Sequence, residues 1–192
     1  MSLMLVVAQV GLVLVSWVMA SVITDTQLRS LLSAEGIRWF CGTFTANMLS
    51  PLLVWLLQLG IAGGILVRSR LAFDLSHFRA MSPFRRNALL VVAWEALAVM
   101  LVVALLTLAP HAILLSATGC LFPSSFSVFI LPAIALVLIM SGITYGCICE
   151  HFVSLVDVFD AAVYGIVISS PLLVIYSLGI EFYHSIVWVV GI

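Results

Sequence analysis

The chain has 192 residues, of which 65% are hydrophobic and only 8% are charged, and its formal net charge is −1. Soluble domains carry about 25% charged residues, which cover their water-facing surface. This composition excludes a soluble enzyme and a disordered tail, and it lacks the basic face that binding to nucleic acid requires. The chain is therefore expected to be an integral membrane protein, and its expected partner is the lipid bilayer that surrounds it.

Five continuous apolar stretches are long enough to cross a bilayer as helices, because a span requires about 20 apolar residues. Apolar and polar residues do not alternate within these stretches, which excludes the strands of a membrane barrel. The predicted fold is all-α: a multi-pass transmembrane helical bundle that forms one domain over residues 1–192. The predicted spans lie near residues 3–23, 46–67, 88–109, 126–149 and 161–180.

The end of the chain, Glu181–Ile192, is too short to cross the bilayer alone. Two interpretations remain open for it. It is either an interfacial segment that Tyr183 and Trp188 anchor, or the point at which the chain is truncated relative to a longer protein.

The arginines predict the orientation in the membrane. Five of the seven lie in the loop Arg68–Asn87, whereas the loop between the first two spans holds only Arg29 and Arg38. Because basic loops stay in the cytoplasm, the Arg68–Asn87 loop and the N-terminus are predicted to be cytoplasmic. An odd number of spans then places the C-terminus outside.

The outer loop between the first two spans has an amphipathic pattern. Thr24–Gln27 has the spacing of a capping box, which predicts the start of a helix. Ile37, Phe40 and Phe44 then recur at helical spacing, so a short helix in the outer membrane interface is predicted.

The inner loop has a second amphipathic pattern. Leu71, Leu75 and Phe78 share one helical face beside several arginines, a pattern that favours contact with anionic lipid headgroups. Ser82 and Pro83 are expected to begin the third span as its N-cap and first-turn proline.

Two segments, Arg29–Phe40 and Pro51–Gly64, carry motifs in a fixed order. They resemble the AbgT family of p-aminobenzoyl-glutamate transporters, in which a Leu-Leu-Ser-x-Glu-Gly-Ile-Arg-Trp motif precedes a span with Pro-Leu and Leu-Gly-Ile-Gly sequences. The matching positions are Leu31, Leu32, Ser33, Glu35, Gly36, Ile37, Arg38, Trp39, Pro51, Leu52, Leu59, Gly60 and Ile61.

The resemblance implies common ancestry and a dimer-forming scaffold in the bacterial inner membrane. Together with the polar residue Glu95 inside a predicted span, it favours a protein of the transporter class, either a transporter or one half of a transporter. Its substrates would be small aromatic carboxylates such as p-aminobenzoyl-glutamate, and it would act as a homo-oligomer or with a second membrane subunit. The acidic residue that the family carries after Gly-Ile-Gly is absent here, as are its polar hairpin motifs. These departures favour the alternative function: a non-transporting membrane scaffold or accessory protein derived from the same fold.

Polar residues inside the predicted spans are candidates for a substrate or coupling-ion site, because burying them in lipid is costly. By a helical rise of 1.5 Å per residue, they are all predicted to lie about 9–14 Å from the cytoplasmic ends of their spans. Hydrogen bonding between helices is the structural alternative. The candidates are Glu95, Gln58, Gln9, Ser141 and Ser169.

Gly60, Gly63 and Gly64 give the second span a small-residue surface that includes a GxxxG motif. Close packing against another helix is the expected use of this surface. An unwound helix that lines a substrate route is the alternative.

The sequence Cys147-Ile-Cys149-Glu-His151 is the nearest approach to a metal motif. On a helix, however, its two thiols point about 200° apart, and no second Cys/His pair completes a four-ligand set. No metal site and no cofactor are therefore expected. No catalytic motif is visible either, so the chain is not expected to be an enzyme.

Overall fold

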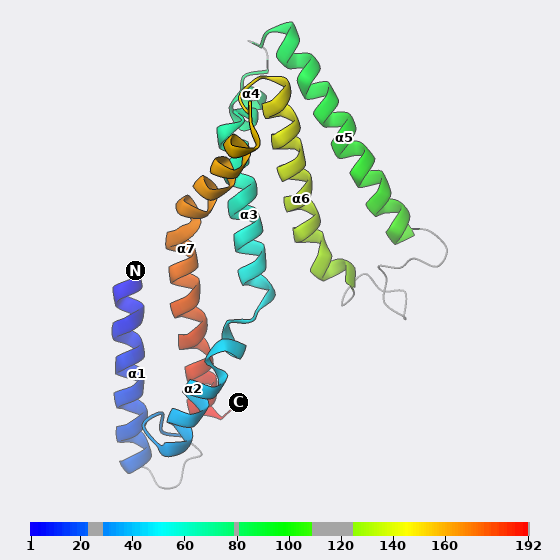
Figure 1. Cartoon of the computed structure of the whole chain (residues 1–192). Helices are drawn as coiled ribbons and strands as arrows, with labels where there is room; N and C mark the ends of the chain where they lie inside the picture. The colour runs from blue at the N-terminus through cyan, green and yellow to red at the C-terminus, as the bar shows by residue number, and fades with distance from the viewer. Residues whose placement is uncertain (23–28, 79–80, 109–124, 192) are drawn as a thin grey trace. The chain divides into compact units, whose positions relative to one another are not determined.

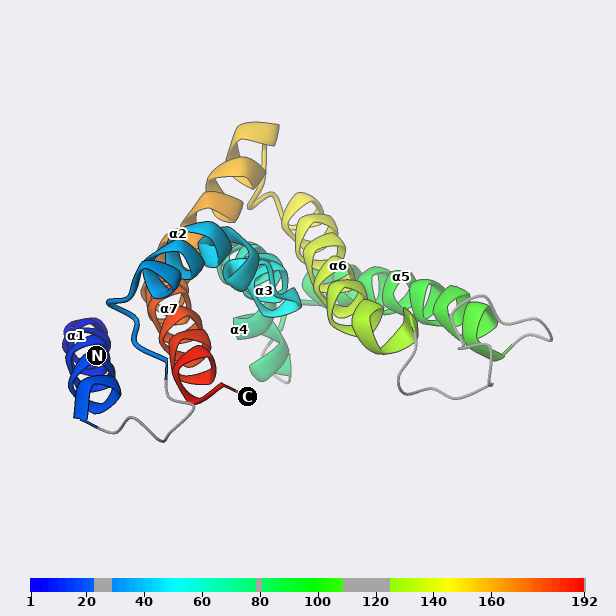
Figure 2. The same cartoon turned by 90° about the horizontal axis from the view of Figure 1, so that it is seen from below.

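The computed structural model describes residues 1–22, 29–78, 81–108 and 125–191. These residues form seven helices and no strand (Figures 1 and 2), which confirms the predicted all-α fold. The helices are α1 (Ser2–Val22), α2 (Ala34–Met48), α3 (Pro51–Arg68), α4 (Leu71–Ser76), α5 (Pro83–Leu108), α6 (Ser125–Ile148) and α7 (Leu155–Val190).

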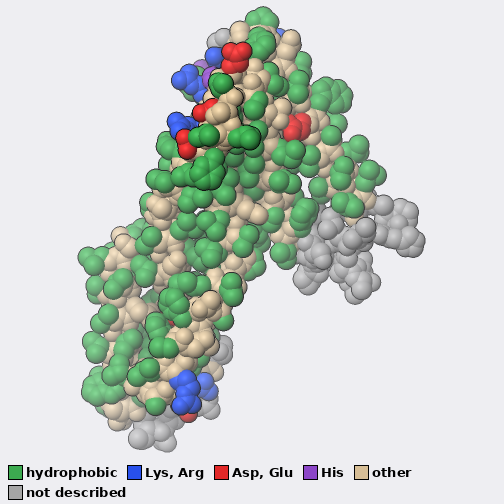
Figure 3. Space-filling model, viewed as in Figure 1, with side chains coloured by type: hydrophobic (Ala, Val, Ile, Leu, Met, Phe, Trp, Pro, Cys, Tyr) green, Lys and Arg blue, Asp and Glu red, His purple; other side chains and the backbone are tan. Residues whose placement is uncertain are grey.

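Five of the described helices, α1, α3, α5, α6 and α7, are long and apolar enough to cross a membrane. This confirms the predicted multi-pass arrangement. Hydrophobic side chains cover most of the surface visible in Figure 3, as expected where lipid is the solvent.

Several helix boundaries are determined by local capping. Ser33 is the N-cap of α2, and its hydroxyl accepts a hydrogen bond from the Gly36 N–H at 3.0 Å. The predicted helix start at Thr24–Gln27 lies outside the described residues. At the start of α5, the Ser82 hydroxyl accepts from the Arg85 N–H at 3.5 Å and Pro83 occupies the first turn, as predicted.

The last helix, α7, is much longer than its predicted span of 161–180. Its 36 residues extend about 54 Å at 1.5 Å per residue, more than the roughly 30 Å of a bilayer core. Pro171 lies inside α7 without ending it, and the helix stops before Gly191, whose positive φ of 76° suits a glycine cap. Most of Glu181–Ile192 therefore continues α7 and does not form a separate element.

The chain divides into two compact units, whereas the sequence predicts one domain. The first unit comprises Met1–Val54 and Ser170–Ile192, and the second comprises Trp55–Ser169.

In the first unit, α1 and α2 contact the C-terminal part of α7. The backbone N–H of Arg29 donates to the carbonyl of Val189 at 3.1 Å. The Leu31 N–H donates to the buried Ser16 hydroxyl at 3.3 Å. These contacts attach the segment before α2 to both α1 and α7.

The second unit contains two apolar clusters. Leu71 of α4 packs with Ala88, Val92 and Tyr145, which belong to α5 and α6. The other cluster is formed by Ile65, Phe152 and Ala161. Together the two clusters connect α3, α4, α5, α6 and the N-terminal part of α7.

Candidate functional site

A cavity of about 220 Å³ lies among α1, α2 and α7 within the first unit. It is mostly apolar, and Gln9, Ser177 and Glu181 are its polar lining residues. The full lining is Leu5, Val6, Gln9, Val10, Phe40, Phe44, Met48, Ser177, Leu178 and Glu181.

Glu181 is the ionisable group of this cavity and is only 6% exposed. Neither of its carboxylate oxygens has a hydrogen-bond partner among the described residues, and the Oε1 of Gln9 has none either. The Asn47 amide approaches the carboxylate without hydrogen-bond geometry, and His184 lies within electrostatic range of it. A buried, unpaired carboxylate in a membrane protein is costly and indicates a function.

Helical spacing explains why these groups meet. Ser177, Glu181 and Ser185 recur every four residues, so they lie on one face of α7. Gln9 of α1 faces the same side, and its Nε2 donates to the Ser185 hydroxyl at 2.9 Å. This contact joins the predicted residue Gln9 to a part of α7 beyond the predicted spans.

A second pocket of the first unit, of about 410 Å³, combines a cation with aromatic rings. The rings of Trp39 and Trp188 are stacked, with centroids 5.3 Å apart and an interplanar angle of 23°. The Arg29 guanidinium carbon lies 6.0 Å from the centroid of the Trp188 ring. The described lining contains no acidic residue and consists of Arg29, Trp39, Asn47, His184, Val187, Trp188 and Gly191.

The other four predicted polar residues belong to the second unit. Gln58 has its Oε1, and Glu95 its Oε2, buried without a hydrogen-bond partner in the described part of the chain. Ser141 is 6% exposed. The Ser169 hydroxyl donates to the carbonyls of its own helix at Gly165 (2.9 Å) and Ile166 (3.2 Å).

The small residues of α3 lie directly against α7 in the second unit. A Cβ on Gly64 would collide with the backbone of Ala161 and Gly165, and a Cβ on Gly60 would collide with the Ser169 side chain. Ala161, Gly165 and Ser169 themselves recur every four residues on α7. Gly63, by contrast, faces open space, because a Cβ added there would meet nothing within 4 Å.

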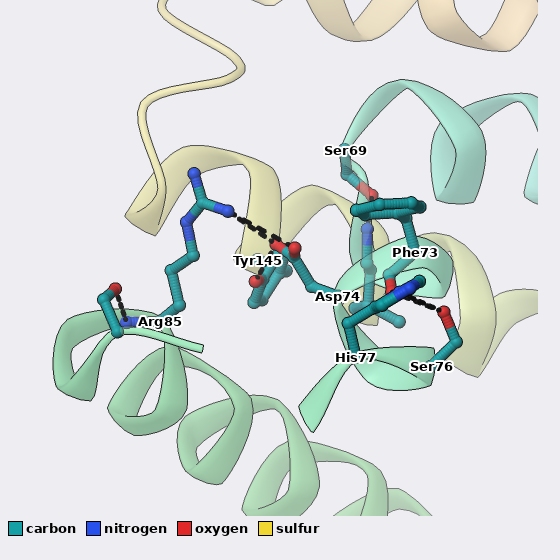
Figure 4. Close-up of polar contacts among 9 residues, drawn as sticks. Ser69, Phe73, Asp74, Ser76, His77, Arg85 and Tyr145 are labelled. Carbon is teal, nitrogen blue, oxygen red and sulfur yellow. Dashed lines mark hydrogen bonds and ion pairs between the residues drawn. The ribbon is translucent and has the colours of Figure 1, made fainter. Parts of the chain in front are cut away.

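A polar cluster fastens α4 to the ends of α5 and α6 (Figure 4). Asp74, 3% exposed, accepts a hydrogen bond from the Tyr145 hydroxyl at 2.6 Å. Arg85 donates to the two Asp74 oxygens at 3.3 and 3.5 Å. The cluster changes which face of α4 is buried: Leu71 and Asp74 are inside, whereas Leu75 and Phe78, predicted to share the face of Leu71, are 59% and 46% exposed.

The residues of the Cys147–His151 motif lie at the end of α6 and in the turn that follows it. Burial raises the pKa of the Cys149 thiol, which disfavours the thiolate that binds metals. Burial, followed by the charges of Arg70 and Arg85, lowers the pKa of His151. The His151 Nε2 is buried without a partner in the described part of the chain.

Sequence reasoning misses two of the buried carboxylates. Glu181 lies one residue beyond the predicted fifth span, although Phe182–Val190 contains no glycine or proline that would end the helix. Asp74 is an acidic residue within a loop rich in arginine, and this position alone is only a weak indication that its side chain is buried. The helical spacing of Ser177, Glu181 and Ser185 is the available sign that α7 continues.

Comparison with known proteins adds no relative: no family model, no curated protein and no solved structure matches the chain. The resemblance to the AbgT family stays a prediction that rests on the quoted motifs.

Proposed function

We propose that the chain is an AbgT-like inner-membrane transporter, or a transporter half, for small aromatic carboxylates such as p-aminobenzoyl-glutamate. The substrate class comes from the motif resemblance. The observation that carries the proposal is the Arg29 pocket, because its chemistry suits this class independently of the resemblance.

An aromatic carboxylate has a flat apolar ring and an anionic group. The indoles of Trp39 and Trp188 supply a flat aromatic wall against which a ring can pack in an offset-stacked or edge-to-face arrangement. Arg29 and His184 supply hydrogen-bond donors for the carboxylate, and a guanidinium binds carboxylates with two parallel hydrogen bonds. A volume of about 410 Å³ falls within the usual range for small-molecule sites.

The proposed orientation has the N-terminus in the cytoplasm, so the Arg29 pocket opens at the outer end of α1. Arg68, Arg70, Arg85 and Arg86 belong to the cytoplasmic loop, as positive-inside placement requires. A homo-oligomer or a second membrane subunit would complete the transport route. Gln58, Glu95, Ser141 and Ser169 of the second unit remain predicted residues of that route.

Calorimetric titration of p-aminobenzoyl-glutamate into the purified full chain tests the proposal. We expect saturable binding that Arg29→Gln weakens about tenfold or more, the consequence of losing a charge-assisted contact of about 1.5–3 kcal/mol. Arg38→Gln is the matched control, because Arg38 is exposed on α2 and does not line the pocket. It should bind like the wild type.

Two outcomes would contradict the proposal. Absence of binding by folded wild-type protein would favour the scaffold function. Equal loss of affinity in the Arg29 and Arg38 variants would show that general charge, and not the pocket, attracts the ligand.

A further inference from the structure

Two polar residues connect the Arg29 pocket to the buried Glu181 carboxylate of the first unit. Asn47 and His184 line the pocket, and they are also the polar neighbours of the carboxylate. His184 follows Glu181 by three residues on α7, and side chains three residues apart on a helix are neighbours. Glu181 itself is 6% exposed and does not line the pocket. Its charge therefore acts on the pocket through space and through these two neighbours, without contact with a bound molecule.

The titratable groups around this carboxylate are few in the described part of the first unit. No residue of α1 has an ionisable side chain. Arg29 supplies a fixed positive charge to the pocket. The Tyr183 ring lies edge-on to the His184 ring, with centroids 5.5 Å apart, and a phenol is neutral at neutral pH. The ionisable residues of α2 are exposed and line neither cavity; they are Glu35, Arg38 and Cys41. The charges that can change beside the pocket near neutral pH are therefore those of Glu181 and His184.

We propose that an anion binds to the Arg29 pocket together with a proton, which Glu181 and His184 share. A carboxylate in the pocket and the Glu181 carboxylate are like charges in a medium of low dielectric constant, so each opposes the other. A proton on Glu181 removes this repulsion, and a proton on His184 adds a positive charge and a hydrogen-bond donor for the ligand. Because the two groups interact, the proton belongs to the pair and not to one residue. As regulation of ligand binding, the inference rests on the proposed function.

A purely structural role for Glu181 gives different expectations. If the carboxylate only holds Asn47 in position, Glu181→Gln keeps the size of the side chain and a hydrogen-bond acceptor, and ligand affinity should change little at any pH. If the charge of Glu181 opposes the ligand, the same variant should bind the ligand more tightly than the wild type. The gain should be largest at alkaline pH, where the wild-type pair has lost its proton. Higher affinity after a substitution outside the pocket lining therefore distinguishes the two roles.

Calorimetric titration of p-aminobenzoyl-glutamate into the purified full chain at about pH 6 and about pH 8 tests the inference, because the ligand carboxylates stay ionised over this range. We expect the wild type to bind about tenfold or more tightly at the lower pH, as uptake of up to about one proton requires. Repeating each titration in two buffers with different enthalpies of ionisation measures this uptake.

Three variants assign the proton to the pair. Glu181→Gln should bind several-fold more tightly than the wild type at the higher pH, and the double variant Glu181→Gln, His184→Gln should bind with nearly the same affinity at both pH values. Glu150→Gln is the matched control, because Glu150 is exposed and belongs to the second unit, and it should behave like the wild type. The thermal stability of Glu181→Gln should equal or exceed that of the wild type, since an amide is cheaper to bury than a carboxylate.

Benzoate, a simpler aromatic carboxylate, is titrated in parallel and separates this inference from the proposed function. Equal affinity at both pH values, or no gain of affinity in Glu181→Gln at the higher pH, would overturn the inference alone. Binding of benzoate that depends on pH, without binding of p-aminobenzoyl-glutamate, would contradict only the proposed substrate. Absence of binding of both ligands to folded wild-type protein would overturn both proposals. If Glu181→Gln does not fold, proton uptake by the wild type decides the inference, and ligand binding without uptake would overturn it.

Discussion

At the scale of single residues, the polar groups of this protein differ in how fully they are paired. Asp74 is buried with two partners, the Tyr145 hydroxyl and the Arg85 guanidinium. Glu181 is buried to a similar degree and has neither kind of partner within the described residues. The charge of Asp74 is therefore paired within the protein, whereas Asn47 and His184 are the polar groups that lie near Glu181.

The Asp74 cluster gives a prediction for stability. Tyr145→Phe removes a hydrogen bond to a buried carboxylate and should lower the free energy of unfolding by about 1–3 kcal/mol. Tyr164→Phe makes the same chemical change at a residue that is 40% exposed and should have little effect. Unfolding of each variant by denaturing detergent measures the difference, and equal stabilities would contradict the assigned role of the Tyr145 hydroxyl.

His151 gives a prediction for pH dependence. Its lowered pKa, caused first by burial and then by Arg70 and Arg85, means that the unfolded chain takes up the proton more readily than the folded protein. Stability should therefore fall as the pH drops through the ordinary histidine range towards the lowered pKa.

His151→Gln should lose part of this pH dependence, whereas His77→Gln, at an exposed position, should retain it. Unfolding is compared between the variants at about pH 7.5 and about pH 5.5, on either side of the ordinary histidine pKa, and identical slopes would contradict the prediction.

At the scale of helices, α3 and the N-terminal part of α7 pack through facing small residues. Gly64 meets the backbone of Ala161 and Gly165, and this close approach leaves no room for a side chain. In lipid, where apolar contact alone gives no preference for another helix, such close packing is a principal source of helix association.

Neighbouring glycines of α3 should therefore respond oppositely to alanine. Gly64→Ala forces the two backbones apart and should destabilise the protein by about 1–3 kcal/mol. Gly63→Ala adds its methyl group to open space and should be neutral or stabilising by up to about 1 kcal/mol, because alanine is the better helix former. Detergent unfolding of both variants tests this, and equal destabilisation would contradict the packing described.

The sequence predicts the positions of the helices better than the contacts between them. Long apolar stretches locate five spans because the bilayer fixes the length that a helix must have. The same length rule ends the fifth predicted span at residue 180 and so misses Glu181, which a 36-residue helix carries. The spacing of Ser177, Glu181 and Ser185 marks one face of α7, but it does not indicate which helix that face meets, so the pairing between Gln9 and Ser185 is not predictable from the sequence.

At the scale of the whole molecule, the arginines of the loop between α3 and α5 predict the orientation in the membrane. Single-cysteine variants test it with a membrane-impermeant thiol reagent in intact cells. A variant that keeps only Cys41, which is exposed on α2, should be labelled from outside. A variant with His77→Cys and no other cysteine should be labelled only after the cells are opened, and the reverse pattern would contradict a cytoplasmic N-terminus.

Uptake of radiolabelled p-aminobenzoyl-glutamate into proteoliposomes containing the purified full chain tests transport most directly. The proposed function predicts time-dependent accumulation that exceeds that of empty liposomes, is lost in Arg29→Gln and is retained in Arg38→Gln. Accumulation by the folded wild-type protein that equals that of empty liposomes would contradict transport by this chain alone.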